Sequence, residues 1–233
     1  MMVRPISRGQ AQAIRKVNAG LRRGYGWSSA NWSGMVVAKD ARAINRVSAQ
    51  WIVPHVLPSS RSAYSSAWIG IDGFSNNNLI QTGTSHDYVN GKASYQAWWE
   101  ILPAAETVIP HPVYPGDRIQ ASIAKLGGGN RWVIRMRNAT QNWTFTTVQS
   151  YSGPQSSAEW IVEAPQLNGK PTRLARFAPI KFARCRLNGA NPKLKMNERG
   201  YMVQNNRIVS VPSLPNRDGD GFAVRRTSLP SPS

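Results

Sequence analysis

Hydrophobic and polar positions alternate in short runs along most of the chain, beginning near residue 31. Ile119, Ala121 and Ile123 alternate with their more polar neighbours, and residues 132–137 and 143–146 repeat the pattern. A period of two residues is typical of a strand that buries one face. Further strands are expected at 51–54, 66–71, 95–101, 158–163, 177–182, 202–204, 208–211 and 222–224. After residue 26, no stretch of 11 residues has a helical period.

Turn residues separate these runs. Asp72-Gly73 follows the run 66–71, and Pro103 follows the run 95–101. The chain contains 19 Gly and 16 Pro, which is consistent with many turns between short strands. About a dozen short strands without helices predict an all-β domain, either a β-sandwich or a barrel.

Composition limits the class of protein. The 233 residues are 41% hydrophobic and include nine Trp, so the chain can build a full core and most of it is not disordered. No apolar run approaches the roughly 18 residues of a membrane-spanning helix, so no membrane span is expected. The single cysteine, Cys185, excludes an intramolecular disulfide and a cysteine-based zinc site, and the three histidines lack zinc-binding spacing. We therefore expect no metal.

The net charge of +18 is concentrated at the two ends of the chain. Residues 1–26 hold six Lys/Arg and no acid, 27–169 hold ten against eight acids, and 170–233 hold thirteen against three. A strongly basic chain can bind nucleic acid. Because the aromatic-rich middle is nearly neutral, we do not expect that here. We expect a basic arm or pro-segment at 1–26, a folded domain at 27–226 and a flexible tail at 227–233.

The basic arm has no apolar stretch of the kind found in a secretory signal. Ile14, Val17 and Leu21 fall at roughly helical spacing, which indicates either a short amphipathic helix or a disordered arm. The arm is then either an exposed leader without a role or a pro-segment that pairs with acidic groups of the domain.

The common hydrolase motifs are absent. There is no GxSxG and no phosphate-binding GxxxxGK[ST] loop. Ser85-His86-Asp87 is a poor triad candidate, because triads are assembled by the fold and not by adjacency in sequence. What remains is a small set of acids among tryptophans. Glu159 and Glu163 would share one strand face, and burial there would favour a proton-transfer role, although a solvated strand end is the alternative.

Seven motifs in order resemble the glutamic peptidases (peptidase family G1, the eqolisins), especially their bacterial members. They are SSANWSG at 28–34, WIVP at 51–54, AWIGIDG at 67–73, IQTG at 80–83, YQAWWE at 95–100, PGD at 115–117 and SAEWIVEAP at 157–165. Each motif alone is weak, but seven in order are specific. The resemblance covers residues 28–225.

This resemblance implies a β-sandwich of two bent antiparallel sheets, similar to the jelly roll of concanavalin-type lectins. It assigns the catalytic pair to Gln81 and Glu163 and makes Glu159 a nearby non-catalytic acid. The substrate-binding residues that it implies are Trp32, Trp68, Asp72, Gln96 and Glu100. Fungal members have an aspartate where this chain has Gln96 and an aromatic residue where it has Leu102, which affects substrate preference and pH optimum.

The function implied is that of an acid endopeptidase. Glu163 would act as general base and acid on a bound water, and Gln81 would stabilise the oxyanion. No cofactor is needed, and the expected partners are polypeptide substrates of a monomer, with no nucleic acid. The resemblance implies a secreted or extracytoplasmic protein, although no standard signal is visible. The alternative is a non-catalytic sandwich that binds carbohydrate or peptide, since exposed tryptophans would suit either ligand.

Overall fold

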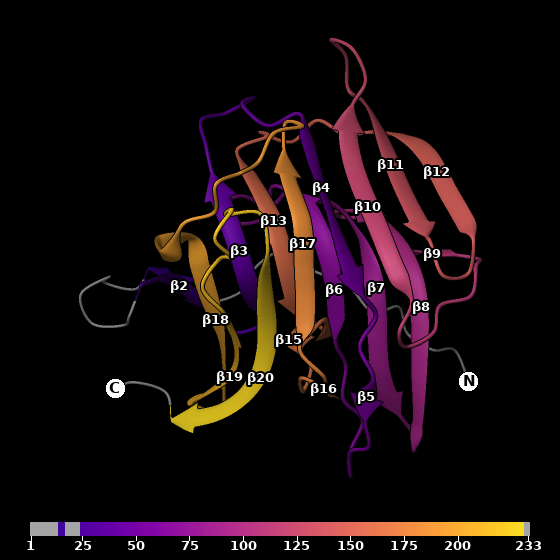
Figure 1. Ribbon diagram of the computed structural model, residues 1–233, viewed down its shortest axis with the longest axis vertical. Coiled ribbons are helices and arrows are strands. Elements are labelled where there is room, and N and C mark those ends of the chain that lie inside the picture. Colours follow the sequence, from indigo (N-terminus) through magenta and orange to yellow (C-terminus); the bar gives the residue numbers. More distant parts are fainter. Residues whose placement is uncertain (1–13, 17–23, 231–233) are drawn as a thin grey trace.

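The structure is a computed structural model that describes residues 14–16 and 24–230, and nearly all of its regular structure is strand. One layer of the molecule is an antiparallel sheet with the order β12-β11-β10-β4-β17 (Figure 1). Its strands are β12 (Trp143–Ser150), β11 (Arg131–Asn138), β10 (Arg118–Lys125), β4 (Arg46–Ile52) and β17 (Ile180–Leu187).

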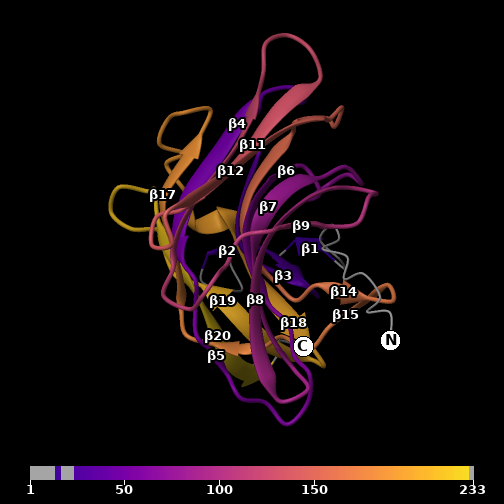
Figure 2. The same cartoon turned by 90° about the vertical axis from the view of Figure 1, so that its right-hand side faces the viewer.

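The second layer continues the hydrogen-bonded path in the order β3-β13-β6-β7-β8-β9, and we call it the back sheet. Its strands are β3 (Trp32–Ala38), β13 (Ser157–Glu163), β6 (Ser66–Ile71), β7 (Ile80–Val89), β8 (Lys92–Ile101) and β9 (Thr107–Ile109). Figure 2 shows β4 and β17 on one side of the molecule and β6, β7 and β9 on the other. The expected β-sandwich is confirmed.

Three further strands carry the path from one layer to the other: β18 (Arg199–Gln204), β19 (Arg207–Pro212) and β20 (Phe222–Pro230). β2 (Tyr25–Ser29) pairs in parallel with β18, and β1 (Arg15–Lys16) pairs with β2. Short pairs are formed by β5 (Val56–Leu57) with β16 (Arg176–Phe177) and by β14 (Gln166–Leu167) with β15 (Lys170–Pro171). Within the described residues, the helical structure is one 3-10 turn, η1 (Met196–Glu198), and no helix is long and apolar enough to cross a membrane.

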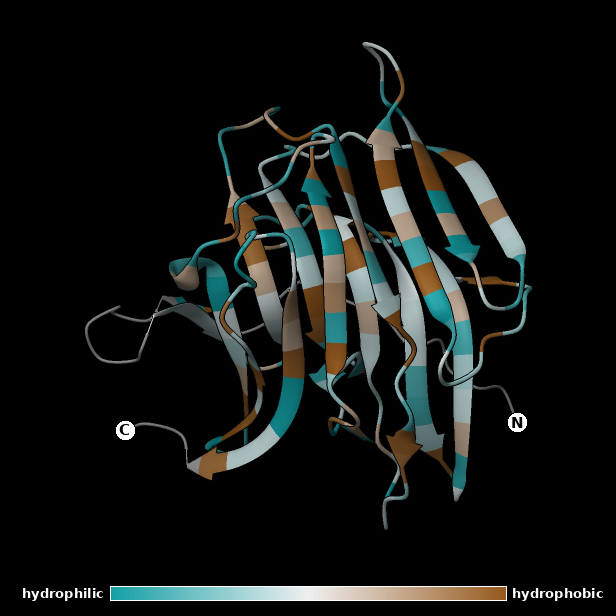
Figure 3. Ribbon diagram, in the orientation of Figure 1, coloured by the Kyte–Doolittle hydropathy of each residue, from teal (hydrophilic) through white to brown (hydrophobic). Residues whose placement is uncertain are grey.

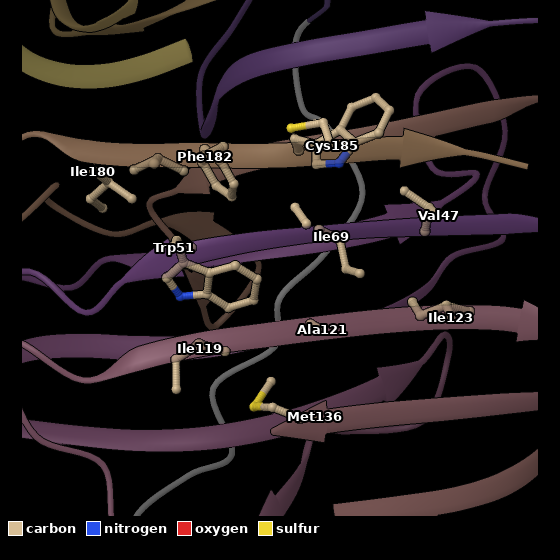
Figure 4. Packing of buried hydrophobic residues seen from close by; sticks show 14 of the residues in the cluster. Val47, Trp51, Ile69, Ile119, Ala121, Ile123, Met136, Ile180, Phe182 and Cys185 are labelled. Carbon is tan, nitrogen blue, oxygen red and sulfur yellow. The ribbon is translucent and has the colours of Figure 1, made fainter. Parts of the chain in front are cut away.

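The main core fills the space between the layers. Trp51 of β4 packs against Phe182 of β17 with ring centroids 5.9 Å apart, and Ile69 of β6 faces them from the back sheet (Figure 4). The alternation read from the sequence places these side chains inward: in β10, Ile119, Ala121 and Ile123 belong to this core. The same alternation appears as stripes of opposite hydropathy along the strands (Figure 3).

The ends of the chain differ from the sequence expectations in two details. Arg15 and Lys16 are extended and paired, so the helical spacing that began at Ile14 does not form a helix there; Val17 and Leu21 lie outside the described residues. Sheet pairing is available to this segment at β2, and a short helix would lack such partners. β20 continues to Pro230, which pairs with Arg207, so the segment expected to be a tail is a strand as far as residue 230. Residues 231–233 are outside the described part.

Strand β2 also crosses the domain boundary expected between residues 26 and 27. Trp27 is buried, and its indole N–H donates to the carbonyl oxygen of Glu198 at 2.9 Å. Gly26 and its neighbours on β2 are therefore part of the sheet, so the folded domain includes Tyr25 and Gly26.

Candidate active site

The face of the back sheet turned away from the main core carries a second cluster of buried apolar residues, which we call the tryptophan face. Strand alternation puts Trp160 in the main core and Ile161 on this face, and likewise separates Ile69 from Trp68. The buried members of the cluster are Trp27, Trp32, Val36, Trp68, Leu79, Trp98 and Ile161. Trp32 and Trp68 meet edge to face with ring centroids 4.8 Å apart.

The strand register arranges the candidate residues in three rows across the tryptophan face. The first row runs Glu159–Gly70–Gln81–Glu100. The middle row runs Ile161–Trp68–Gly83–Trp98, and the third runs Trp32–Glu163–Ser66–Ser85–Gln96. All the predicted site residues except Asp72 are therefore on one face of one sheet, with Gln81 and Glu163 in the rows on either side of Trp68.

Glu163 ends β13 and is fully buried. The indole N–H of Trp68 donates to its Oε2 at 2.9 Å, and the Asn31 side-chain amide donates to its Oε1 at 3.4 Å. Asn31 is itself fixed, because its carbonyl oxygen accepts from the backbone N–H of Ala164 at 2.9 Å. Two N–H donors, one on β6 and one in the bend between β2 and β3, orient the carboxylate. Hydrogen bonds to an ionised group are among the stronger ones.

Gln81 lies near the start of β7 and is also fully buried. Its amide nitrogen donates to Oε2 of Glu100 on β8 at 2.6 Å. The two residues are direct cross-strand partners, so the pairing of β7 with β8 sets this contact. Glu100 thus fixes the position of the Gln81 amide nitrogen, which is a hydrogen-bond donor.

A glycine keeps the middle row open. A Cβ on Gly83 would overlap the Cβ of Trp68 and the carbonyl oxygen of Ala67, both on the neighbouring strand β6. Only a residue without a side chain lets β7 approach β6 this closely beside the Trp68 ring. Gly83 therefore permits the Trp68 position from which the indole reaches Glu163.

Asp72 lies at the end of β6, where it adopts a left-handed φ of 72°. Its carboxylate accepts from the Tyr151 hydroxyl at 2.6 Å, the backbone N–H of Gln155 at 2.7 Å and the backbone N–H of Ser156 at 2.9 Å. The Asn76 amide and the Ser156 hydroxyl donate to it at 3.2 Å. These bonds hold the loop before β13 against β6. The substrate-binding role predicted for Asp72 stays a prediction.

The remaining predicted residue, Gln96, is half-buried at the end of the third row, and its amide donates to Oε1 of Glu106 at 3.1 Å. Ser85 and His86 are consecutive on a strand and so point to opposite faces. The His86 ring lies 2.8 Å from the Thr84 hydroxyl, and Asp87 accepts from the backbone N–H of Ser65. The geometry agrees with the rejection of a triad at 85–87. Within residues 14–16 and 24–230, no group of three or more His, Cys, Asp or Glu could hold a metal ion.

Glu159 is the unusual carboxyl group of the site. It is fully buried, and neither of its oxygens has a hydrogen-bond partner in the described part of the chain. Burial, followed by the nearby carboxylate of Asp72, raises its pKa well above the ordinary value, and the Ser157 hydroxyl opposes this shift. Burial therefore favours the neutral, protonated form of Glu159. The sequence placed it on the same face as Glu163 but gave no sign of this protonation state.

Two functional contacts were missed by sequence reasoning. Asn31 falls inside the SSANWSG motif, which could have singled it out. Its hydrogen bond to Glu163 was not predicted, because the two residues are 132 positions apart in the sequence. Tyr151, which binds Asp72, lies in a loop that had no recognisable motif. Burial and the carboxylate of Asp72 raise the pKa of the Tyr151 hydroxyl, which keeps it a hydrogen-bond donor.

Comparison with known proteins identifies the family of this chain. The family model described as the Peptidase A4 family matches residues 30–216. Aspergillopepsin-2 of Aspergillus niger is 27% identical over 202 residues, which is 76% of this chain and 70% of that protein. Scytalido-glutamic peptidase, solved with a transition state analog inhibitor, matches with a TM-score of 0.71 and 23% identity, covering 85% of this chain and 98% of its own. SCP-B, an eqolisin solved with the tripeptide Ala-Ile-His, matches with a TM-score of 0.66, 22% identity and the same coverage. Because the family model spans most of the chain, the protein belongs to the Peptidase A4 family, the eqolisins or glutamic peptidases, and is an endopeptidase of that family.

Proposed function

We propose that the protein is an acid endopeptidase in which Glu163 moves the proton and Gln81 stabilises the oxyanion. The observation that carries the proposal is the placement of both side chains on one face of the back sheet, each oriented by its own hydrogen bonds. Glu163 is oriented by Trp68 and Asn31, and Gln81 by Glu100. A polypeptide laid across the middle row, over Trp68, would have one of them on each side.

The reaction follows from these positions. The Glu163 carboxylate takes a proton from a water molecule while the water oxygen attacks the carbonyl carbon of the peptide bond. The carbonyl oxygen becomes an oxyanion and accepts a hydrogen bond from the Gln81 amide nitrogen, an interaction worth roughly 3 kcal/mol in the transition state. Protonated Glu163 then gives its proton to the amide nitrogen, the C–N bond breaks, and the amine leaves. Water is consumed, and Glu163 returns to the carboxylate.

The tryptophan face supplies the surroundings that this chemistry needs. Trp32 and Trp68 are apolar walls beside Glu163, and Glu100 orients the catalytic amide, so we assign these residues to substrate binding and positioning. Gln96 ends the row that contains Glu163, where it would contact a substrate residue several positions away from the cleaved bond. A single carboxylate acting without a histidine is expected to work at acid pH, and we propose activity outside the cytoplasm as a monomer.

Glutamine variants of the two buried glutamates test the assignment. Glu163→Gln keeps the size of the side chain and an acceptor oxygen for the Trp68 indole, but its amide cannot take up a proton. Cleavage of a denatured protein at pH 3–4 should therefore fall by about 10²–10⁴-fold. Glu159→Gln is the matched control, because it lies on the same strand and face and already holds a neutral acid. If Glu159→Gln loses the activity and Glu163→Gln keeps it, the base is Glu159, which shares the row of Gln81.

We also propose that the segment before Tyr25 is a pro-segment. Its described residues support this: Ile14 packs against the tryptophan face, and Arg15 and Lys16 pair with Ser28 and Trp27. A chain segment at that position covers apolar surface that a substrate would use. Because β2 belongs to the sheet, removal of the segment is expected before Tyr25.

Intact-mass measurement after incubation at about pH 3–4 tests the pro-segment. A shortened chain beginning near Gly24, with higher activity than the starting protein, is the expected result. Ile14→Asp should speed this conversion by weakening the apolar contact, whereas Arg42→Gln, an exposed change far along the chain, should not. A full-length chain that stays uncut and equally active would show that the segment does not inhibit.

A further inference from the structure

The lower end of the molecule contains a cavity of about 690 Å³ whose charged lining residues are all arginines. It lies where β18, β19 and β20 approach β15 and the loop after β5 (Figures 1 and 2). We call it the arginine pocket, and its lining is Arg61, Arg173, Arg207 and Arg226 with Thr172, Gln204, Asn205, Thr227 and Ser228, and a few apolar residues. Three of the four arginines come from the basic C-terminal block, whose charge the peptidase site does not use.

Among the residues that the structure describes, the arginines of this pocket have no counter-ions. Within residues 14–16 and 24–230, none of the four forms an ion pair; the ion pair found there is Arg186–Asp220, outside the pocket. Arg226 is half-buried, and its Nε is buried without a hydrogen-bond partner. Burial, followed by the cations of Arg173 and Arg176, lowers the pKa of Arg226. Several positive charges around a buried donor that has no acceptor are electrostatically unfavourable, and a bound anion would relieve both costs.

The pocket has a fixed floor. The Gln204 amide donates to the carbonyl oxygens of Thr172 at 2.8 Å and Ala30 at 3.4 Å, and its oxygen accepts from the backbone N–H of Leu174 at 3.3 Å. These bonds tie β18, the segment after β15 and the bend before β3 together in the lining of the pocket. Arg207 is held at the rim by a bond from Nη1 to the Ser228 hydroxyl at 3.3 Å. The arginines therefore line an open pocket: Arg61, Arg173 and Arg207 are exposed, and Arg226 is half-buried.

We propose that the arginine pocket binds a tetrahedral oxyanion of the phosphate or sulfate class. Guanidinium groups match such oxyanions with paired N–H donors, and several around one cavity favour a ligand with three or four acceptor oxygens. Carboxylates lose their charge near pH 4, whereas a phosphate monoester keeps at least one negative charge, since only its second proton has a pKa near 6. The oxyanion is either free phosphate or the phosphoryl group of a phosphorylated polypeptide. Binding of either ligand is independent of the peptidase mechanism.

Isothermal titration with inorganic phosphate at low ionic strength, at pH 4 and pH 7, tests this binding site. The wild-type protein should bind phosphate saturably with one site at both pH values. Arg226→Gln and Arg173→Gln should each weaken binding about 10-fold or more. Arg225→Gln is the matched control: it is exposed, next to Arg226 on β20 and on the opposite strand face, so its binding should be unchanged. Arg173 is exposed, so its variant tests the site even if Arg226→Gln fails to fold.

No saturable binding, or equal weakening by Arg225→Gln and Arg226→Gln, would overturn the proposal, because the effect would belong to the general positive charge. A phosphoserine peptide that binds at least 10-fold more tightly than phosphate, with its unphosphorylated form inactive, would make a polypeptide the carrier. Equal affinity for peptide and phosphate would make the free ion the ligand. Both of these results support an oxyanion site.

Discussion

The neutral state of Glu159 predicts that the protein becomes less stable as the pH rises. Within residues 14–16 and 24–230, Glu159 is buried without a hydrogen-bond partner. The groups of these residues that act on it are the Asp72 carboxylate, the Tyr151 hydroxyl and the Ser157 hydroxyl, none of them a cation. Its pKa is raised in the folded state above a reference near 4.5. The folded protein therefore holds a proton that the unfolded chain releases once the pH exceeds 4.5. Stability is fully present below that pH and is lost as the pH rises toward the folded-state pKa.

The size of the effect follows from proton linkage. One proton difference between the folded and unfolded states lowers the free energy of unfolding by about 1.4 kcal/mol per pH unit. Over the first two units above 4.5, the loss reaches at most about 3 kcal/mol, or roughly 6–12 °C in Tm for a chain of this length. Glu159→Gln replaces the acid with a group that does not titrate, so it should remove this slope and stabilise the protein near neutral pH relative to the wild type.

The assay is denaturant unfolding followed by tryptophan fluorescence at several pH values from 4 to 7. Using the Glu163→Gln background for both proteins limits self-digestion. Asp40→Asn, an exposed carboxylate, is the control and should keep the wild-type pH dependence. The reasoning is refuted if Glu159→Gln and the wild type lose stability in parallel above pH 4.5, because the titrating group would then lie elsewhere.

Three further predictions concern the site and the core. Gln81→Ala should lower kcat by roughly 10²–10³ on a denatured protein substrate; a change in KM alone would make Gln81 a ground-state binding residue. Trp68→Phe keeps an aromatic side chain but removes the indole N–H that donates to Glu163, so kcat/KM should fall by about 10- to 100-fold. An unchanged kcat/KM would mean that this hydrogen bond does not contribute to catalysis. Cys185 is fully buried and burial raises its thiol pKa, so a thiol reagent should label it only after unfolding; rapid labelling of the native protein would contradict this.

Much of the fold could be predicted from the sequence, because the alternation of a strand depends only on neighbouring positions. Ile119, Ala121 and Ile123, which alternate with more polar neighbours, are in the core as expected. The seven motifs were also readable in order, and the family that they indicated is confirmed. At the ends of the chain local signals failed, because the pairing of Arg15 with β2 and of Pro230 with Arg207 depends on partners distant in sequence.

The site itself needed the tertiary structure. The resemblance carried by the motifs implied Gln81 and Glu163 as a pair. Strand alternation, which is a local property of the chain, put Glu159 and Glu163 on one strand face. The sequence did not reveal that β6 lies between Gln81 and Glu163, that Trp68 and Asn31 orient Glu163, or that Glu159 is a neutral acid beside Asp72. Nor could it show four arginines around one cavity, since they come from separate segments. Hydrogen bonds, burial and charge proximity depend on which strands become neighbours, and only folding decides that.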